Sequence, residues 1–369
     1  MSNHSTLFVG LDVHKDSIAV AYVQHGTEAV VVDYGTIGTQ QYAIRRLIKK
    51  LSARGADLVL AYEAGPCGFW LHRLLTQWGY RCFVVAPSLV PKRPGERIKT
   101  DRRDARKLAL NLKAGTLTPV HIPSPTEEAF RDVVRAWHQA KWDVTKAKQR
   151  LAHFLLRNDI RYTGKTPWTA AHRRWLSELV LPSAAQQIVF QELVMAVAER
   201  ERRRDRLEQQ LDLLAPDWPG YDLARVLQAF RGLQKTVSYT VVAEACDLSR
   251  FAHPRHFMAW LGLIPAEYSS GSKRRQGRIT RSGNRWARTM LIEAAWSYRY
   301  TPKVSRIIQL RQEKVPAQIL DIAWQAQLRL HKKYRRLMGR GVTKNKVITA
   351  LARELAGFIW AAGRAHQQA

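Results

Sequence analysis

The sequence predicts an α/β region followed by an α-helical one: a mixed β-sheet flanked by helices near the N-terminus, then long helices, then a mainly helical C-terminal region. Three observations predict this. Two β-rich runs flank a short polar turn within residues 6–23, which indicates a hairpin. Strand and helix patterns then alternate up to residue 86, which favours a sheet covered by helices. Beyond residue 124, apolar residues recur at three- and four-residue intervals, which is typical of long packed helices.

The chain of 369 residues is strongly basic, because 60 Lys and Arg against 30 Asp and Glu give a net charge of +30. Such a charge predicts binding to nucleic acid, since neutralised phosphates release counterions; an anionic membrane surface is the weaker alternative. No apolar run is long enough to span a bilayer, and the first residues lack the pattern of a signal peptide. Three scattered cysteines, Cys67, Cys82 and Cys246, show neither metal-ligand nor disulfide spacing. We therefore expect a cytoplasmic, nucleoid-associated protein with no membrane partner.

The N-terminal elements are expected within residues 1–120. The predicted order is a hairpin (6–23), a strand (29–33), a helix (40–53), a strand (57–62), a helix (69–78) and a strand (81–86). This order, βββαβαβ, is that of the ribonuclease H-like fold, in which helices flank a mixed sheet. A proline-rich basic stretch (88–99) is expected to form a loop, and a helix (100–112) follows it.

A coiled coil is expected within residues 121–216. Ser124, Pro125 and Glu127 form a capping box with proline at the first helical position. The helix that starts there has a seam in three-four alternation, formed by Phe130, Val133, Trp137, Ala140, Val144, Ala147, Leu151 and Phe154. A second long helix (185–214) continues the pattern through Phe190, Leu193, Val197, Leu207, Leu211 and Leu214, with Arg200 and Arg204 interrupting it. The two helices could pair within one chain or between two protomers.

The third predicted domain spans residues 217–369 and is mainly helical. Its first predicted helices cover residues 223–230, 237–246 and 254–261, and another covers residues 285–296. Between the last two lies a polar, glycine-dotted stretch (266–284) without helical or strand periodicity. The tail beyond residue 302 is helical and basic.

Four carboxylates stand where the elements of a ribonuclease H-like sheet converge. Asp12 lies on the first strand, Glu63 ends the fourth, and Asp101 with Asp104 begins the following helix. Singly, each could be structural: a strand-end cap, a turn residue, or a helix charge favoured by the dipole. Together they supply oxygen ligands for two Mg²⁺ ions, which activate the nucleophile and stabilise the leaving oxygen in phosphodiester chemistry. The combination favours the metal site.

Ser269 and Ser270 stand before Gly271 in the polar stretch. Serine before glycine is commonly only a turn, but here a cationic segment follows that places a hydroxyl for attack on a phosphodiester. Its candidate nucleic-acid-binding residues are Lys273, Arg274, Arg275, Arg278, Arg281 and Arg285. A phosphate-binding loop without chemistry is the alternative. The nearby aromatics could stack on bases or belong to the core: Trp286, Trp296, Tyr298 and Tyr300.

These motifs resemble those of the IS110-family (IS1111-like) transposases, also called bridge-RNA-guided recombinases. The resemblance covers nearly the whole chain: GLDVHKDS, YEAG and KTDRRDARKLA are similar to the RuvC-like DEDD domain, and GLIPAEYSSGSKRRQGRITRSGNRWAR to the serine-bearing domain. It implies that the four carboxylates hold Mg²⁺, or Mn²⁺, and that Ser270 rather than Ser269 forms a covalent phosphoserine link to DNA. It also implies a structured guide RNA, donor and target DNA as substrates, and dimers that assemble into tetramers. One departure is the stretch from Phe230 to Gln234, where many members carry a glycine-rich hairpin.

Three functions are compatible with these residues. The first is a transposase that cuts and rejoins DNA through serine chemistry with a metal-bearing acidic site. The second is a metal-dependent, structure-specific nuclease of the Holliday-junction type, in which the serine loop only clamps phosphate. The third is a non-catalytic nucleic-acid-binding protein, which four intact carboxylates argue against. A sugar-kinase-like ATPase is disfavoured, because Val13, His14 and Lys15 stand where glycines and hydroxyl residues would be expected after Asp12.

Overall fold

The computed structural model describes residues 5–26, 30–91, 100–271, 273 and 275–368. The chain forms two compact units, Met1–Ile122 and Pro123–Ala369, which we describe separately. Arg274 and residues 92–99 of the expected loop lie outside the described residues. The predicted boundary near residue 217 inside the second unit stays a prediction.

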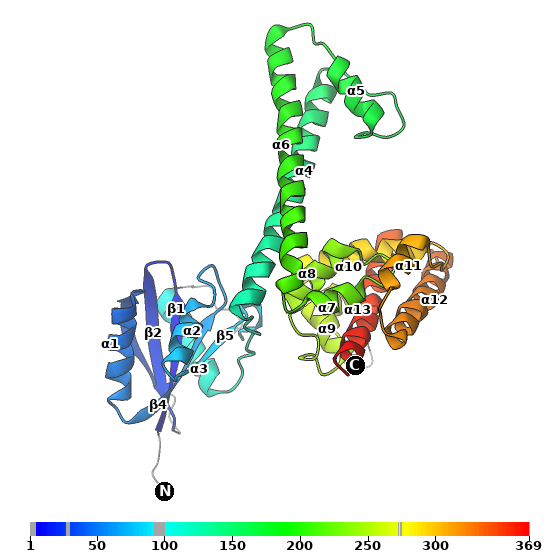
Figure 1. Cartoon of the computed structure of the whole chain (residues 1–369). Coiled ribbons are helices and arrows are strands. Elements are labelled where there is room, and N and C mark those ends of the chain that lie inside the picture. The colour runs from blue at the N-terminus through cyan, green and yellow to red at the C-terminus, as the bar shows by residue number, and fades with distance from the viewer. Residues whose placement is uncertain (1–4, 27–29, 92–99, 272, 274, 369) are drawn as a thin grey trace. The chain divides into compact units, whose positions relative to one another are not determined.

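The first unit contains a five-stranded mixed sheet in the order β3-β2-β1-β4-β5 (Figure 1). β1 pairs antiparallel with β2 and parallel with β4, and β5 adds parallel to β4. The strands are β1 (Ser5–Val13), β2 (Ser17–Gln24), β3 (Val31–Gly38), β4 (Ala56–Glu63) and β5 (Arg81–Val85). With α1 after β3 and α2 after β4, the predicted βββαβαβ order and the mixed sheet flanked by helices are confirmed.

The two faces of this sheet differ in the size of their side chains. Leucine, isoleucine and tyrosine side chains of one face form a core with α1 (Gln41–Ser52) and α2 (Trp70–Gln77). α3 (Asp101–Lys113) covers the other face, where Ala19 and Ala21 meet Ala105. At Gly10 of β1, a Cβ atom would lie 2.1 Å from the carbonyl oxygen of Ala105. The glycine therefore allows the backbone of α3 to lie directly on β1.

The third strand differs from the prediction of residues 29–33, because it begins at Val31 and continues to Gly38. It passes through Gly35, whose φ is 109°, and pairs with β2 across a bulge between Val20 and Ala21. The bulge allows the pairing with β2 to continue past Gly35, a residue type that is disfavoured inside strands. Residue 29 lies outside the described residues.

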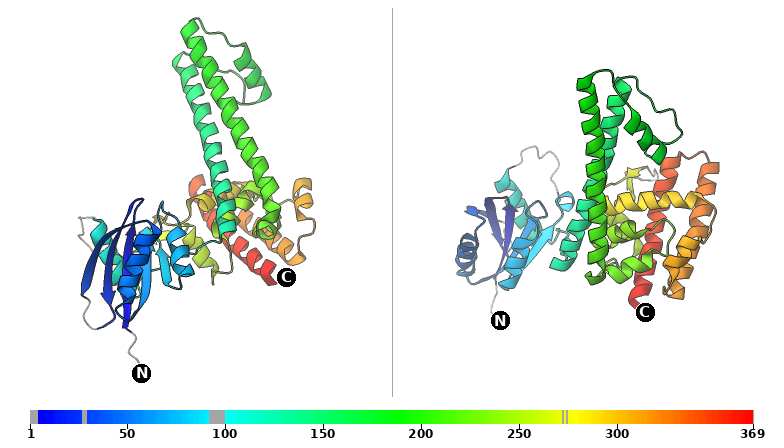
Figure 2. Two further views of the ribbon diagram at one scale, coloured as in Figure 1. Left: turned by 60° about the vertical axis from the view of Figure 1, so that its left-hand side comes forward. Right: turned by 45° about the horizontal axis from the view of Figure 1, so that its top comes forward.

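The second unit begins with a helical hairpin formed by α4 (Pro125–Arg157) and α6 (Ala184–Leu214), which pack along each other within one chain (Figure 1). Both views of Figure 2 show the same pairing, with α5 (Ala170–Glu178) at the far end. The capping box is confirmed: the Glu127 N–H donates to Ser124 Oγ, and the Ser124 N–H donates to the Glu127 carboxylate.

The predicted seam is largely buried on α4 and only partly on α6. On α4, Val134 is buried in place of Val133. On α6, Leu214 is 45% exposed rather than part of the seam. The helix ends there and is followed by the single turn η2 (Ala215–Asp217).

The rest of the second unit is a helical bundle around one large apolar core. Its helices are α7 (Tyr221–Leu227), α8 (Lys235–Ala245), α9 (Pro254–Trp260), α10 (Arg285–Ala295), α11 (Arg306–Gln312), α12 (Ala317–Gly339) and α13 (Lys344–Gln368). Two short 3₁₀ turns are η1 (Pro87–Leu89) in the first unit and η3 (Trp296–Arg299) here. Among the described residues, no helix is long and apolar enough to cross a membrane.

The polar, glycine-dotted stretch, for which no strand was predicted, contains a small antiparallel hairpin of β6 (Pro265–Glu267) and β7 (Gln276–Ile279). Its base is fastened to the bundle, because the Thr280 N–H donates to the Ile264 carbonyl and the Asn284 N–H to the Trp260 carbonyl. We call residues 265–279 the serine hairpin, since Ser269 and Ser270 lie in its connecting loop.

Candidate functional site

Asp12, His14 and Asp101 form the centre of an acidic cluster in the first unit. Asp12 is the second-last residue of β1, and Asp101 is the first residue of α3. The His14 Nε2 atom lies 3.3 Å from Asp12 Oδ2 and 3.4 Å from Asp101 Oδ1. One ligand atom from each of the three lies within 4.8 Å of the other two, a spacing at which one cation can contact all three.

Glu63 and Asp104 flank this centre. β1 and β4 are parallel and pair through Leu11 and Tyr62, so Asp12 and Glu63 follow at neighbouring strand ends on the same face of the sheet. Asp104 lies in the first turn of α3, and its charge contributes to the raised pKa of Asp12. The fold thus brings Asp12, Asp101 and Asp104 into electrostatic contact, with Glu63 on the adjacent strand.

Local interactions fix the first turn of α3. The Arg103 N–H donates to Thr100 Oγ1 at 3.3 Å, which caps the helix. Asp33 of β3 accepts hydrogen bonds from Arg102 and Arg106 of α3, with the Arg106 contact at 3.1 Å. The hydrogen bond from Arg102 holds the pKa of Asp33 below its ordinary value. Asp33 is therefore an anchor that ties the acid-bearing helix to the sheet.

The pKa of the Asp12 carboxyl lies above its ordinary value. Burial is the largest cause that raises the pKa of Asp12; His14 opposes this, while the charges of Asp101 and Asp104 raise it further. Several carboxylates around one partly buried acid repel one another unless a cation lies between them. Carboxylate oxygens are the ligands that Mg²⁺ and Mn²⁺ prefer, so the donor set fits a divalent metal ion.

His14 is a site residue that sequence reasoning missed. The prediction placed it only in a polar turn, although it stands two residues after Asp12 in the motif GLDVHKDS. Beside it opens a cleft of about 700 Å³, lined by His14, Thr39, Cys67 and the 38%-exposed Trp70 among others. A cleft of this volume accommodates a group of nucleotide size next to the acidic cluster.

The two serines of the second unit differ in their hydrogen bonding. The Ser269 hydroxyl donates to Glu267 Oε1 at 2.9 Å and accepts from the Arg275 N–H at 3.3 Å. Ser270 is exposed, and its backbone pairs with Lys273 on both sides at 3.1 Å. Among the residues that the structure describes, its hydroxyl has no hydrogen-bond partner. Of the two serines, Ser270 therefore has the hydroxyl with fewer hydrogen bonds among the described residues.

The cationic segment divides into exposed and structural residues. The exposed ones are Lys273, Arg275, Arg278, Arg281 and Arg285. Arg288, in contrast, is half-buried and donates to the Leu261 carbonyl at 2.8 Å. Burial lowers the pKa of Arg288, and the nearby charges of Arg281 and Arg285 lower it further. The exposed cations are the ones free to meet a phosphate.

The aromatic residues left open by the sequence mostly belong to the core. Trp286 stacks on His138 with ring centres 4.9 Å apart, and Tyr298 is buried. Trp296 packs against the main core of the second unit. Tyr300 is 53% exposed and lies beside Arg231 and Arg299, so it alone of the four presents a large exposed ring.

A buried ion pair behind the serine hairpin was not predicted. Glu244 of α8, with a side chain 1% exposed, accepts two hydrogen bonds from Arg135 of α4 at 2.7 and 2.8 Å. Its second oxygen also accepts from Asn284 Nδ2 at 2.6 Å. Asn284 caps α10 directly after the serine hairpin. One carboxylate thus joins the helical hairpin to the segment that carries the candidate nucleophile.

Comparisons with known proteins give consistent matches. A family model described as "Transposase IS116/IS110/IS902 family" matches residues 224–309, and a DEDD-type model described as "Transposase" matches residues 9–158. The chain is 39% identical over 368 residues to a putative transposase of Sinorhizobium fredii, covering 100% of this chain and 91% of the relative. It is 30% identical over 335 residues to the transposase for insertion sequence element IS1533 of Leptospira borgpetersenii, covering 90% and 96%. It is 22% identical over 295 residues to the transposase for insertion sequence element IS1111A of Coxiella burnetii, covering 78% and 76%.

Proposed function

Since the chain belongs to the IS116/IS110/IS902 family of transposases, we propose that it moves its insertion sequence by serine chemistry joined to a metal-bearing acidic site. The enzyme acts on DNA, and its DEDD domain implies an acidic site for a divalent metal ion. Beyond these statements, we propose which residues act, a covalent phosphoserine intermediate with DNA, and a guide RNA.

The observation that carries the proposal is the exposed hydroxyl of Ser270, which has no hydrogen-bond partner among the described residues and lies in a cationic hairpin. In the proposed step, Ser270 Oγ forms a bond to the phosphorus of a DNA phosphodiester, and the bond to one deoxyribose oxygen breaks. The serine proton leaves to a base, and the released deoxyribose oxygen takes up a proton. Attack by a deoxyribose hydroxyl on the phosphoserine reverses these changes and rejoins a strand.

The cationic side chains of the hairpin have an electrostatic task in this step. Negative charge develops on the non-bridging oxygens of the phosphodiester, and arginine is suited to bind it through paired N–H donors. Arg275, Arg278 and Arg281 are the exposed candidates nearest to Ser270 along the chain. The hydrogen bonds that hold Ser269 support the choice of Ser270 over its neighbour.

In the acidic site, Asp12, Glu63, Asp101 and Asp104 would hold Mg²⁺, with Mn²⁺ as the alternative. A bound divalent ion supplies charge stabilisation at phosphodiester oxygens. The chain's own contribution is the position of the acids: β1 and β4 present two of them, and Asp33 fixes the helix that presents the others. The adjacent cleft at Trp70 provides room for a nucleotide of the substrate.

The proposal extends to a structured guide RNA and to assembly as dimers or tetramers, which the family resemblance implies. The net charge of +30 supports a second nucleic-acid partner beside DNA. A metal-dependent nuclease without serine chemistry is the competing function, and it needs only the acidic cluster.

The test uses the purified chain, RNA transcribed from its flanking element, Mg²⁺ and end-labelled DNA that carries the element junction. We expect a protein–DNA adduct that survives denaturation in the wild type and in Ser269→Ala, and none in Ser270→Ala. Asp12→Asn is the control for the acidic site. Free cut ends in Ser270→Ala, with no adduct in the wild type, would instead establish the nuclease. Omission of the RNA tests the guide separately.

A further inference from the structure

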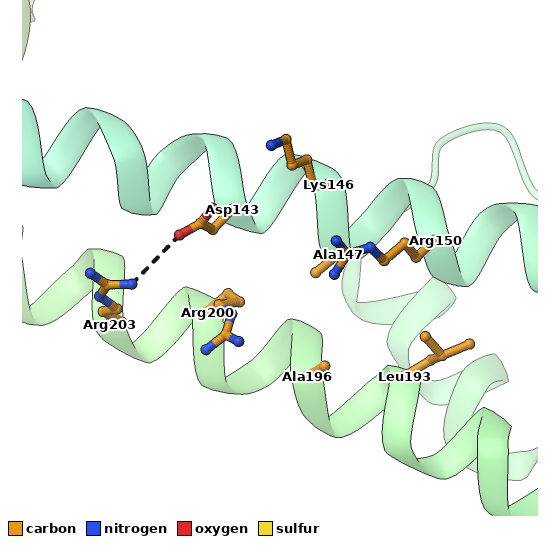
Figure 3. A pocket seen from close by; sticks show the side chains of 8 residues that line it. All are labelled: Asp143, Lys146, Ala147, Arg150, Leu193, Ala196, Arg200 and Arg203. Carbon is orange, nitrogen blue, oxygen red and sulfur yellow. Dashed lines mark ion pairs between the residues drawn. The ribbon is translucent and has the colours of Figure 1, made fainter.

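The helical hairpin carries a cationic cleft that the proposed function does not use. It has a volume of about 300 Å³ and lies between α4 and α6 (Figure 3). Ala147 and Ala196 line its floor, and because alanine ends at Cβ, the two helices leave a hollow there. Four cations surround it, two from each helix: Lys146, Arg150, Arg200 and Arg203. We call these residues the cationic cleft.

Little negative charge balances these cations. Asp143 is the single acid in the lining, and it lies 3.5 Å from Arg203 Nη1. Within the described part of the chain, Lys146, Arg150 and Arg200 have no ion-pair partner. Cations one helical turn apart repel each other, so an arrangement with three unpaired charges favours an anion in the hollow.

The neighbouring face of the same hairpin provides a contrast. There, Glu201 lies 2.7 Å from Lys148 Nζ and 3.0 Å from Arg173 Nη2. These hydrogen bonds hold the pKa of Glu201 below its ordinary value and tie α5 to the hairpin. The cations on that face have a structural task, whereas among the described residues three of the four cations of the cationic cleft have no acid partner.

Trp142 of α4 connects the cleft to the start of α10. It is 48% exposed, and its ring lies 4.4 Å from Lys146 Nζ and 5.5 Å from Arg285 Cζ. Arg285 is the first residue of α10, the helix that follows the serine hairpin along the chain. Two cations and an exposed aromatic ring therefore lie between the start of α10 and the cleft, a combination suited to a phosphate backbone.

We propose that the cationic cleft binds the phosphate backbone of the DNA whose strand the serine hairpin attacks. The inference rests on the proposed function for the identity of the nucleic acid as DNA. Lys146 and Arg150 are four positions apart, or about 6 Å along α4. Contacts from such cations to phosphates contribute affinity without sequence preference.

The test measures the affinity of the full chain for duplex DNA by fluorescence anisotropy across a series of KCl concentrations. Arg150→Ala with Arg200→Ala removes one cleft cation from each helix. Lys141→Ala with Arg202→Ala is the matched control, because it removes two exposed cations from the same helices outside the cleft. We expect the slope of log K against log salt to fall by about 1.8 in the cleft variant, at about 0.9 per lost phosphate contact. Extrapolated from 1 M salt, this is a loss of affinity of roughly 60-fold at 0.1 M.

A variant that is expected to bind DNA more tightly distinguishes an effect on binding from a folding defect. Asp143→Asn releases Arg203 from its acid, so we expect tighter binding and a slope larger by up to about 1. Equal slopes in the wild type, the cleft variant and the control would overturn the inference. A change seen only with a structured RNA of matched length would overturn the assignment to DNA. Because anisotropy measures binding without strand cleavage, failure of the serine chemistry remains distinguishable from failure of the cleft.

Discussion

Gly10→Ala tests the close approach of α3 to the sheet. The added Cβ atom would lie 2.1 Å from the Ala105 carbonyl oxygen and 2.6 Å from the Ala109 nitrogen, and both are backbone atoms of α3 that cannot rotate away. α3 would have to shift, together with Asp101 and Asp104 in its first turn. We expect destabilisation of about 3 kcal/mol, the upper part of the usual range for overpacking.

The assay combines thermal unfolding with divalent-ion binding by calorimetry. For a unit of this size, about 3 kcal/mol corresponds to a decrease of roughly 10 °C in the midpoint of the transition that unfolds the sheet. At a temperature where the variant stays folded, we also expect weaker ion binding. Gly339→Ala is the control, because nothing lies within 4 Å of its added Cβ atom. A Gly10→Ala protein with the wild-type midpoint and ion affinity would refute the reasoning.

Three further predictions concern polar groups that are buried or partly buried. Glu244→Gln should cost about 3 kcal/mol in chemical denaturation, because the buried Arg135 pair loses its charge, while Asp205→Asn, at an exposed pair, should change stability by under about 0.5 kcal/mol. Burial lowers the pKa of His138 from its ordinary value of 6.5 to about 4. Between these two pH values the imidazole of His138 is protonated in the unfolded chain and neutral in the folded chain. The free energy of unfolding should therefore fall as pH decreases from about 6.5 to 4, by at most about 3 kcal/mol. Asp33→Asn should weaken divalent-ion binding in calorimetry by roughly 10-fold, since Asp33 fixes the helix that carries Asp101.

Each of these has its own contradicting result. A chemical denaturation curve unchanged by Glu244→Gln would show that the charge of the Arg135–Glu244 pair does not stabilise the fold. Identical acid dependence in the wild type and in His138→Gln would remove His138 from the pH effect. Ion affinity retained in Asp33→Asn would show that α3 needs no anchor on β3.

Elements with a local signal could be predicted from the sequence, and those that depend on distant pairing could not. The apolar spacing around Ile44 and Leu47 and the capping box at Ser124 each fix a helix within a few residues. The extent of β3 depends on a bulge opposite Val20, which no pattern in its own residues encodes. The serine hairpin is polar throughout and pairs only two short strands, so it offers no apolar alternation to find.

The residues of the candidate site also divide into those with a local sequence signal and those that depend on distant contacts. Asp12, Glu63, Asp101 and Asp104 could be predicted as metal ligands because their order along a recognisable fold places them at one edge. The anchoring role of Asp33 and the pairing of Arg135 with Glu244 join residues 69 to 109 positions apart, and such contacts have no signature in a single sequence. His14 lies in the motif GLDVHKDS, in which only Asp12 was predicted as a site residue.

The helical hairpin has a mechanical consequence. α4 has 33 residues and α6 has 31, and neither contains a glycine or an internal proline at which a helix would bend. One end of α4 belongs to the core of the bundle through Phe130 and Trp137, and the other belongs to a separate core through Leu151 and Phe154. At about 1.5 Å per residue α4 is roughly 50 Å long, so it acts as a stiff lever arm with its fulcrum beside Glu244. We expect a force applied at the tip to act as torque on the bundle that carries the candidate nucleophile.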